Sequence, residues 1–234
     1  MKPIIGIVAS VLVQEDVSRL YISEYYRNAV IEFGGEPLLL LPTQQILHNK
    51  VRISENAPMT DAEKESLLKW VKQCDGIIIP GGTKMFEYYF VVLDYAIKED
   101  VPIIGTCLGM QVMANYNKKI ETVRNSEDKI SHNVDEDYVH SIKIDKNSKI
   151  YDIVKQDTFM VNSLHNYHVV DSGIYKAVGY SADGLIEALE YPNNTFNIGV
   201  QWHPEMMVKY DDISRKIWTS FMSCAYDYKE KANK

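Results

Sequence analysis

The chain of 234 residues is poor in cysteine, and this shortage excludes one class of protein. Its three cysteines, Cys74, Cys107 and Cys224, cannot all pair with one another, so a disulfide framework is not expected. The composition favours a reducing, cytoplasmic setting, in which one of the three cysteines can be present for the chemistry of its thiol.

Positive charge and long apolar runs are also scarce. The chain has 25 Lys and Arg against 32 Asp and Glu, a formal net charge of -7. Nucleic acid is not expected as a partner, because phosphate binding requires concentrated Lys and Arg. No stretch approaches the roughly 20 apolar residues of a membrane-spanning helix, so no membrane association is expected either.

Features that would divide the chain are missing as well. We find no Gly/Ser linker, no internal repeat and no G-x-x-x-x-G-K-[ST] phosphate loop. With 46% hydrophobic and 24% charged residues, positions 1–234 are expected to form one domain with a sizeable core. We therefore expect no attached synthetase domain and no cofactor.

The first half of the chain alternates between strand and helix patterns. Short β-branched runs predict buried strands, and apolar residues at helical spacing predict the helices that follow them. The strands are predicted at 3–10, 37–41, 76–80 and 101–106, and the helices at 18–33, after the capping box of Thr60 and Glu63, at 85–98 and at 107–116. This alternation predicts a parallel sheet with helices on both faces.

The second half has a different texture, with short strands separated by turn residues. The strands are predicted at 141–144, 158–161, 175–180, 185–190 and 196–201, with a hairpin loop at 192–194 and a final amphipathic helix at 213–228 before a charged tail. The polar stretch 121–137 is interpreted as a surface excursion.

The most informative stretch places Cys107 where a predicted strand meets a predicted helix. The pattern is G-x-C-x-G, with Gly105 and Gly109 flanking the cysteine. This is the cysteine counterpart of a nucleophile elbow, in which glycines allow close backbone approach and the helix amino terminus favours a thiolate. The plain alternative is a small buried cysteine at a βα turn, and for an isolated cysteine that alternative is the commoner one.

A second segment supports the chemical interpretation. His203 and Glu205 stand two residues apart just after a predicted strand, and in an extended chain alternate side chains point the same way. Pro204 between them leaves the local geometry open. A lone histidine at a strand end is usually structural, but a cysteine elbow together with H-x-E has the composition of a Cys-His-carboxylate triad.

Three motifs in this order resemble a known superfamily. PGG at 80–82, GTCLGMQ at 105–111 and GVQWHPE at 199–205 resemble the signatures of class I glutamine amidotransferases. VNSLH at 161–165 and DGLIEALE at 183–190 resemble the γ-glutamyl-γ-aminobutyrate hydrolase branch, which is also grouped as a peptidase family. The resemblance implies an α/β, flavodoxin-like three-layer sandwich with a mostly parallel central sheet and a small antiparallel extension.

The resemblance also implies roles for individual residues. Cys107 would attack a γ-glutamyl carbonyl, His203 would transfer protons, Glu205 would orient the imidazole, and a thioester would form. The backbone N–H groups of Gly82 and Leu108 would hold the oxyanion. Residues expected to bind substrate are Gln111, Ser163, His165 and Tyr167.

Two departures from the hydrolase branch concern the amine half of the substrate. The segment after Gly82 is shorter than is usual in that branch, because the predicted helix follows almost at once. Tyr167 stands where the branch commonly has glutamine, two residues after His165. His165 and His168 could suggest a metal pair, but no acidic ligand clusters with them in the sequence, so no metal is assigned.

Three functions remain open. The first is a free-standing hydrolase that releases glutamate and an amine from a small γ-glutamyl compound. The second is a glutaminase subunit that delivers ammonia to a separate synthetase partner. The third is a non-catalytic binding module, which the presence of Cys107, His203 and Glu205 disfavours. The identity of the amine and the oligomeric state, including a homo-oligomer, are left open.

Overall fold

The computed structural model describes residues 1–14, 17–45, 58–116, 123–124 and 130–232. In this part of the chain, nine strands form one sheet in the order β10-β9-β13-β14-β15-β6-β5-β1-β4. The strands are β1 (Ile4–Val8), β4 (Glu36–Leu40), β5 (Gly76–Ile79), β6 (Ile103–Thr106), β9 (His140–Ile144), β10 (Thr158–Val161), β13 (Lys176–Ser181), β14 (Ile186–Glu190) and β15 (Asn197–Val200).

The sheet has a parallel part and an antiparallel part. Strands β4, β1, β5, β6 and β15 pair in parallel, whereas β14, β13, β9 and β10 continue the sheet in antiparallel pairs. The turn at 192–194 joins the antiparallel strands β14 and β15, as the sequence predicted. The predicted fold class, a parallel centre with an antiparallel extension, is confirmed.

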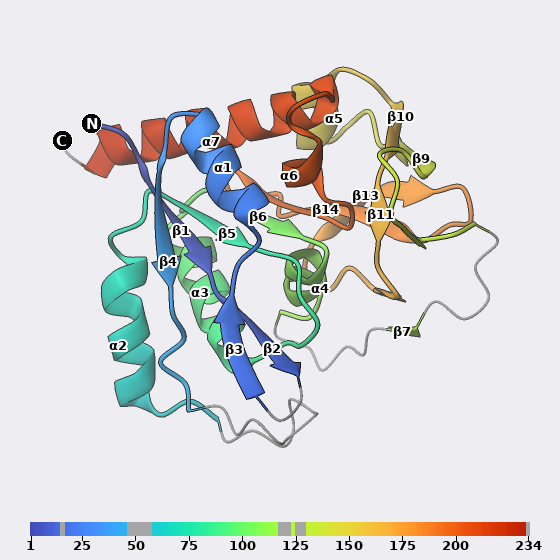
Figure 1. The fold of residues 1–234 in the computed structure, drawn as a ribbon. Coiled ribbons are helices and arrows are strands. Elements are labelled where there is room, and N and C mark those ends of the chain that lie inside the picture. Colours follow the sequence, from blue (N-terminus) through green and yellow to red (C-terminus); the bar gives the residue numbers. More distant parts are fainter. Residues whose placement is uncertain (15–16, 46–57, 117–122, 125–129, 233–234) are drawn as a thin grey trace.

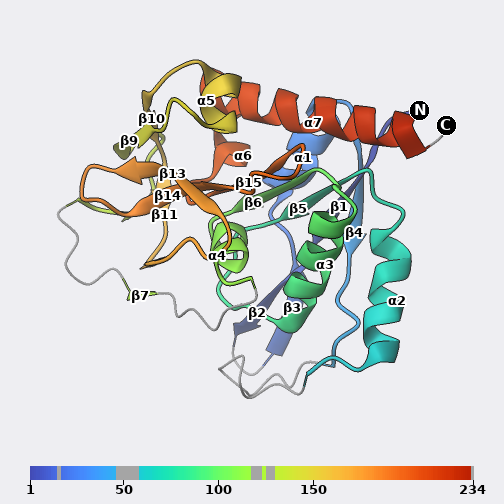
Figure 2. The ribbon, with the colours of Figure 1, turned by 180° about the vertical axis from the view of Figure 1, so that it is seen from behind.

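Helices cover both faces of the sheet (Figures 1 and 2). The long helix α7 lies with α1 and α6 over one face, while α2, α3 and α4 lie over the other, and the two termini are close together. The helices are α1 (Glu24–Glu32), α2 (Asp61–Val71), α3 (Glu87–Lys98), α4 (Leu108–Ala114), α5 (Lys149–Val154), α6 (Pro204–Met207) and α7 (Asp212–Ala232). None of the described helices is long and apolar enough to cross a lipid bilayer.

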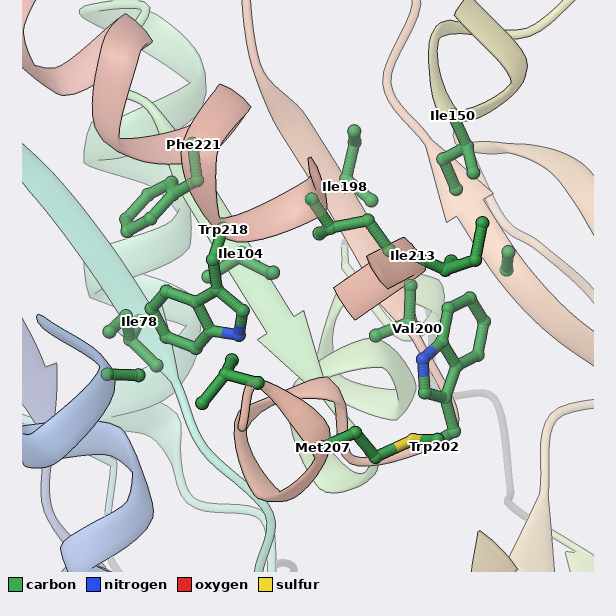
Figure 3. Close-up of a cluster of buried hydrophobic side chains, with 14 of the residues drawn as sticks. Ile78, Ile104, Ile150, Ile198, Val200, Trp202, Met207, Ile213, Trp218 and Phe221 are labelled. Carbon is green, nitrogen blue, oxygen red and sulfur yellow. The ribbon is translucent and has the colours of Figure 1, made fainter. Parts of the chain in front are cut away.

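Alternation along the buried strands produces two cores. In β5, Ile78 faces the core beneath α7, and its neighbours Ile77 and Ile79 face the opposite core. Figure 3 shows the first core, in which Trp218 and Phe221 of α7 pack over sheet residues that include Ile78. Each such fully buried apolar side chain contributes about 1.5–3 kcal/mol, so these contacts fix α7 on the sheet.

The predicted helix at 18–33 is wrong in its first part. Residues Val17–Tyr21 form strand β3, which pairs antiparallel with β2 (Ser10–Gln14) in a hairpin. Helix α1 begins only after Ser23, whose hydroxyl accepts a hydrogen bond from the Tyr25 amide. Residues with near-helical spacing of apolar side chains thus form a strand here, because they pair with β2 in the hairpin.

Other elements agree closely with their predicted ranges. The capping box of Thr60 and Glu63 is present at the start of α2. The final helix is longer than predicted, because it continues through Ala232 into the stretch expected to be a charged tail. Two further small pairs lie outside the main sheet, β8 (Asn133–Val134) with β11 (Ser163–Leu164) and β7 (Val123–Arg124) with β12 (Tyr167–His168).

Candidate active site

Cys107 occupies the sharp turn between β6 and α4. Its backbone has φ 50° and ψ −105°, a region that non-glycine residues rarely adopt and that costs about 1–3 kcal/mol. The Cys107 amide donates a hydrogen bond of 2.8 Å to the carbonyl of Val200 in the neighbouring strand β15. The elbow is therefore held in its strained shape by the sheet beside it.

The two flanking glycines have the steric purpose that the sequence indicated. A methyl group at Gly105 would lie 2.7 Å from the carbonyl carbon of Gly109. A methyl group at Gly109 would collide with the carbonyl oxygen of Ile79 in β5. Only glycine allows α4 to start this close to the two strands, so the close-approach prediction is confirmed.

His203 and Glu205 form a buried pair at the start of α6. Nδ1 of His203 lies 2.6 Å from Oε1 of Glu205. The local geometry, which Pro204 left open in the sequence, is a helical turn that His203 caps and that has Pro204 at its first position. That turn brings residues two apart into contact, and the bond to Nδ1 leaves Nε2 of the imidazole for other partners.

The backbone of His203 is clamped by Asn162, a residue that the sequence motifs did not single out. Asn162 accepts a hydrogen bond of 2.8 Å from the His203 amide and donates one of 3.1 Å to its carbonyl. Asn162 is buried in the VNSLH segment, next to Ser163, which was expected to bind substrate. The position of Asn162 beside Ser163 could have indicated a role at the site. An asparagine amide can both donate and accept, so it can bond the N–H and the C=O of one residue.

Cys107 and His203 meet at Gly81. A methyl group at Gly81 would lie 2.7 Å from Cε1 of His203 and 3.6 Å from Cβ of Cys107. Any larger residue at this position would push the imidazole away from the cysteine. The middle residue of the PGG segment therefore keeps the space in which the thiol and the imidazole approach each other.

The electrostatic surroundings favour the charged imidazolium. Burial by itself lowers the pKa of His203, but the Glu205 carboxylate and hydrogen bonds with Cys107 and Glu205 raise it well above its usual range. A histidine held in its charged form beside a cysteine can stabilise a thiolate and later donate a proton.

The two expected oxyanion donors come from adjacent segments. A methyl group at Gly82 would lie 2.9 Å from Cδ2 of Leu108 and 3.1 Å from Oγ of Ser10. Leu108 is the first residue of α4, where backbone N–H groups have no acceptor within the helix. Their role as an oxyanion hole stays a prediction.

The expected substrate-binding residues lie in different surroundings. Gln111 is buried on α4, and its Nε2 donates to the carbonyl of Tyr167 and to Oε1 of Gln201. The Ser163 hydroxyl donates to the carbonyl of His132. His165 is buried, whereas the Tyr167 residue is 47% exposed. The structure thus brings Tyr167 next to Gln111 through its backbone, and the substrate contacts of all four residues stay predictions.

Tyr26 on α1 is a second residue at this site that no sequence motif indicated. Its hydroxyl accepts a hydrogen bond of 2.8 Å from the Gly81 amide and lies 2.5 Å from Oγ1 of Thr106, the residue before Cys107. Burial raises the pKa of Tyr26 well above its usual range, and the nearby Glu205 carboxylate adds to the rise. One neutral hydroxyl therefore ties the PGG loop to the elbow.

We expect Tyr26→Phe to lower kcat by about 10-fold and the free energy of unfolding by about 1–3 kcal/mol, because the Gly81 amide loses its buried acceptor. The measurements are steady-state kinetics and urea unfolding. Tyr25→Phe is the matched control, since Tyr25 is on the same helix but 46% exposed. Equal effects of the two substitutions would show that Tyr26 does not position the site.

The β2–β3 hairpin lies beside this site. Ser10 at its start donates a hydrogen bond of 3.1 Å to the carbonyl of Gly81. Tyr21 at its end lies near Cys107, and burial together with that thiol raises the pKa of Tyr21. The segment after Gly82 is short, as expected, because α3 begins at Glu87. The hairpin therefore supplies part of the wall around Cys107.

One argument from the sequence, that no acidic ligand accompanies His165, is wrong. Glu187 lies against His165, and His132 and His140 join them in a buried group, while His168 is not part of it. The interpretation of 121–137 as a surface excursion is wrong at His132, which is buried. Residues 121–122 and 125–129 of that stretch lie outside the described residues.

A parallel sheet with a cysteine elbow at one strand end and a His-Glu pair at the next defines a class I glutamine amidotransferase-like hydrolase. More closely, the chain belongs to the Peptidase C26 family, whose model matches residues 86–205 and so includes Cys107, His203 and Glu205.

Comparisons with individual proteins agree with this family. The gamma-glutamyl-gamma-aminobutyrate hydrolase PuuD of Escherichia coli is 24% identical over 98% of this chain and 96% of its own length. The CTP synthase of Chlamydia muridarum is 27% identical over 71% of this chain but only 37% of its own length. In fold, a protein described as a GMP synthase subunit, from Thermoplasma acidophilum, matches with a TM-score of 0.66 at 16% identity, over 100% of both chains.

Proposed function

We propose that this protein is a cysteine-dependent hydrolase that cleaves the γ-glutamyl amide bond of a small compound to glutamate and an amine. The observation that carries the proposal is the elbow of Cys107 facing the His203–Glu205 pair, with a 2.6 Å bond between the histidine and the carboxylate. The proposal treats residues 1–234 as a single catalytic domain.

The proposed reaction starts with proton transfer from Cys107 to His203. The thiolate sulfur adds to the γ-carbonyl carbon, and the oxyanion accepts hydrogen bonds from the amides of Gly82 and Leu108. His203 then gives its proton to the departing amine, and the carbon–nitrogen bond breaks to leave a thioester. Glu205 holds the imidazole through Nδ1 throughout, so that Nε2 faces the reacting atoms.

The second half of the reaction regenerates the thiol. Neutral His203 accepts a proton from water while the water oxygen attacks the thioester carbon. The new tetrahedral intermediate collapses, glutamate leaves, and the sulfur departs as thiolate beside the imidazolium. The imidazolium finally returns its proton to the sulfur, which restores the thiol and neutral His203, and no cofactor enters the sequence of steps.

The γ-glutamyl-γ-aminobutyrate type of substrate is supported by a relative and by two motifs. PuuD of Escherichia coli is similar over almost the whole of both chains. Both branch motifs, VNSLH and DGLIEALE, have buried residues, and Asn162 of VNSLH clamps His203 at the site. The exposed Tyr167 and the hairpin residue Tyr21 are the side chains that we expect to contact the amine half.

A second candidate is a glutaminase subunit that passes ammonia to a separate synthetase. The similarity to part of a CTP synthase favours it, since this chain spans 37% of that protein. In that case the isolated protein would hydrolyse glutamine weakly, and a synthetase partner would raise the rate.

A panel of substrates separates the two candidates. The purified protein is assayed for glutamate release from glutamine, γ-glutamyl-γ-aminobutyrate and other γ-glutamyl amides. We expect kcat/KM for one γ-glutamyl amide to exceed that for glutamine by about 100-fold or more, because a site that bonds the amine half loses that energy with glutamine. Preference for glutamine, or silence on the whole panel, would reject the free-standing hydrolase.

A further inference from the structure

Three histidines and one glutamate meet in the antiparallel half of the molecule, outside the candidate active site. His132 precedes β8, His140 starts β9, His165 follows β11 and Glu187 lies in β14. All four residues are buried, and one potential ligand atom from each lies within 4.8 Å of the others. Four segments that are far apart in the sequence therefore converge on one small volume.

The near nitrogens of all three imidazoles point at the same carboxylate oxygen. Oε1 of Glu187 lies 3.4 Å from Nδ1 of His132, 3.9 Å from Nε2 of His140 and 3.6 Å from Nε2 of His165. In a tetrahedral zinc site with bonds of about 2.0–2.1 Å, ligand atoms lie about 3.4 Å apart. The four ligand atoms lie within 4.8 Å of one another, so the side chains already surround a position for one ion, and the widest pairs would close by about 1 Å to complete the shell.

The far nitrogens of the same imidazoles face hydrogen-bond acceptors. Nε2 of His132 lies 3.1 Å from Oδ2 of Asp183. Nδ1 of His165 lies 3.1 Å from the carbonyl of Tyr167, and Nδ1 of His140 lies 3.4 Å from the carbonyl of Ser141. Carbonyls and carboxylates only accept, so a proton on each far nitrogen would satisfy these contacts and direct the lone pairs of the near nitrogens toward a bound ion.

That arrangement of ligand atoms suits a bound cation. Lone pairs from imidazole nitrogens and a carboxylate repel one another, and burial removes the water that would screen them. Among the described residues, neither oxygen of Glu187 nor Nε2 of His140 has a hydrogen-bond partner. Glu187 and Asp183 together supply two negative charges in a buried setting, which one divalent ion would neutralise.

We propose that His132, His140, His165 and Glu187 bind one divalent transition-metal ion of the zinc type, with Asp183 orienting His132. Imidazole and carboxylate ligands suit zinc, and four protein ligands without an open position are typical of a structural site. Each histidine has the second hydrogen bond through its other nitrogen that metal-bound histidines usually make.

The ion would join the small strand pair of β8 and β11 to the main sheet. Among the described strands, β8 and β11 pair only with each other, whereas His140 and Glu187 belong to β9 and β14 of the main sheet. The Tyr167 carbonyl, which faces His165, also accepts the hydrogen bond from Gln111 in α4. The metal would therefore hold the segment against which Gln111 is positioned, without contacting substrate.

The test is metal content, measured on protein expressed with added zinc and purified without a polyhistidine tag. Mass spectrometry of the metal should find about one zinc per chain, in the wild type and in Cys107→Ala. X-ray absorption should show only nitrogen and oxygen ligands, and Co²⁺ substitution should produce the visible absorption of a tetrahedral site. Sulfur ligands would place the ion at a cysteine and overturn the assignment.

Variants locate the ion. His140→Ala should lose it, Asp183→Asn should weaken zinc affinity by about 10- to 100-fold, and the control His168→Ala should retain it. If His140→Ala fails to fold, Asp183→Asn and the Co²⁺ spectrum still decide. The proposal would be overturned if the wild-type protein contained no metal, bound neither Zn²⁺ nor Co²⁺ and had the same Tm with and without these ions. The four residues would then form a buried charge network without an ion.

Discussion

Cys107→Ala is expected to lower kcat/KM for the preferred γ-glutamyl amide by roughly 10⁴-fold or more and to leave the fold intact. The sulfur is the proposed attacking atom, so no other group in the site can form the thioester. The fold should survive because the elbow is held by the backbone bond from residue 107 to Val200 and by the glycines at 105 and 109, which the substitution does not change.

The measurement compares turnover with thermal unfolding of the same preparation. Cys224→Ala is the control, because that half-buried cysteine is far along the chain in α7 and should keep wild-type activity. Cys74 offers a further contrast, since burial, with Asp75 beside it, raises its pKa to about 12. Alkylation at neutral pH should therefore label Cys107 before Cys74 in the wild type. Substantial turnover by Cys107→Ala would reject the mechanism.

The second large effect concerns the proton-transfer pair. His203→Asn is expected to reduce activity as severely as Cys107→Ala, whereas Glu205→Gln should retain about 100-fold more activity than His203→Asn. The reason is that the imidazole moves the protons, while the carboxylate 2.6 Å away orients it and stabilises its charge. Full activity in Glu205→Gln would exclude Glu205 from the site.

The pH profile of Glu205→Gln tests whether the Glu205 carboxylate stabilises the charged form of His203. Burial lowers the pKa of His203, but Glu205 and Cys107 raise it well above its usual range, so the alkaline limb of kcat/KM should lie above about pH 6.5. In Glu205→Gln that limb should move to lower pH, because the raising charge is lost. The charged pair also stabilises the fold below the unfolded-state pKa, and this contribution is lost as pH rises through the raised pKa.

Much of the fold could be predicted because its elements have strong local signals. The buried strands are short β-branched runs, and the capping box of Thr60 and Glu63 marks a helix start. The hairpin of β2 and β3 had no such signal. Residues 18–21 of β3 fit a helical spacing, and only pairing with β2 decides against a helix there.

Some residues of the candidate site could likewise be predicted from the sequence, and others could not. Cys107, His203 and Glu205 lie in motifs whose residue types state their chemistry, and the glycines at 105 and 109 are explained by close approach. Tyr26 lies in no such motif, and Asn162 lies in VNSLH, which did not indicate its role. A tyrosine on an amphipathic helix is ordinarily a packing residue, and its bond to Gly81 depends on where α1 crosses the sheet.

The sequence by itself determined the layered α/β fold and the chemical class, because both depend on local patterns of residue type. Only the tertiary structure decided which side chains share a volume. His132, His140, His165 and Glu187 are spread over 56 positions of the chain, and none is near another in a metal-binding spacing. The antiparallel strands bring these four residues together. Strand pairing places residues side by side that are far apart along the chain, and the sequence does not show which strands will pair.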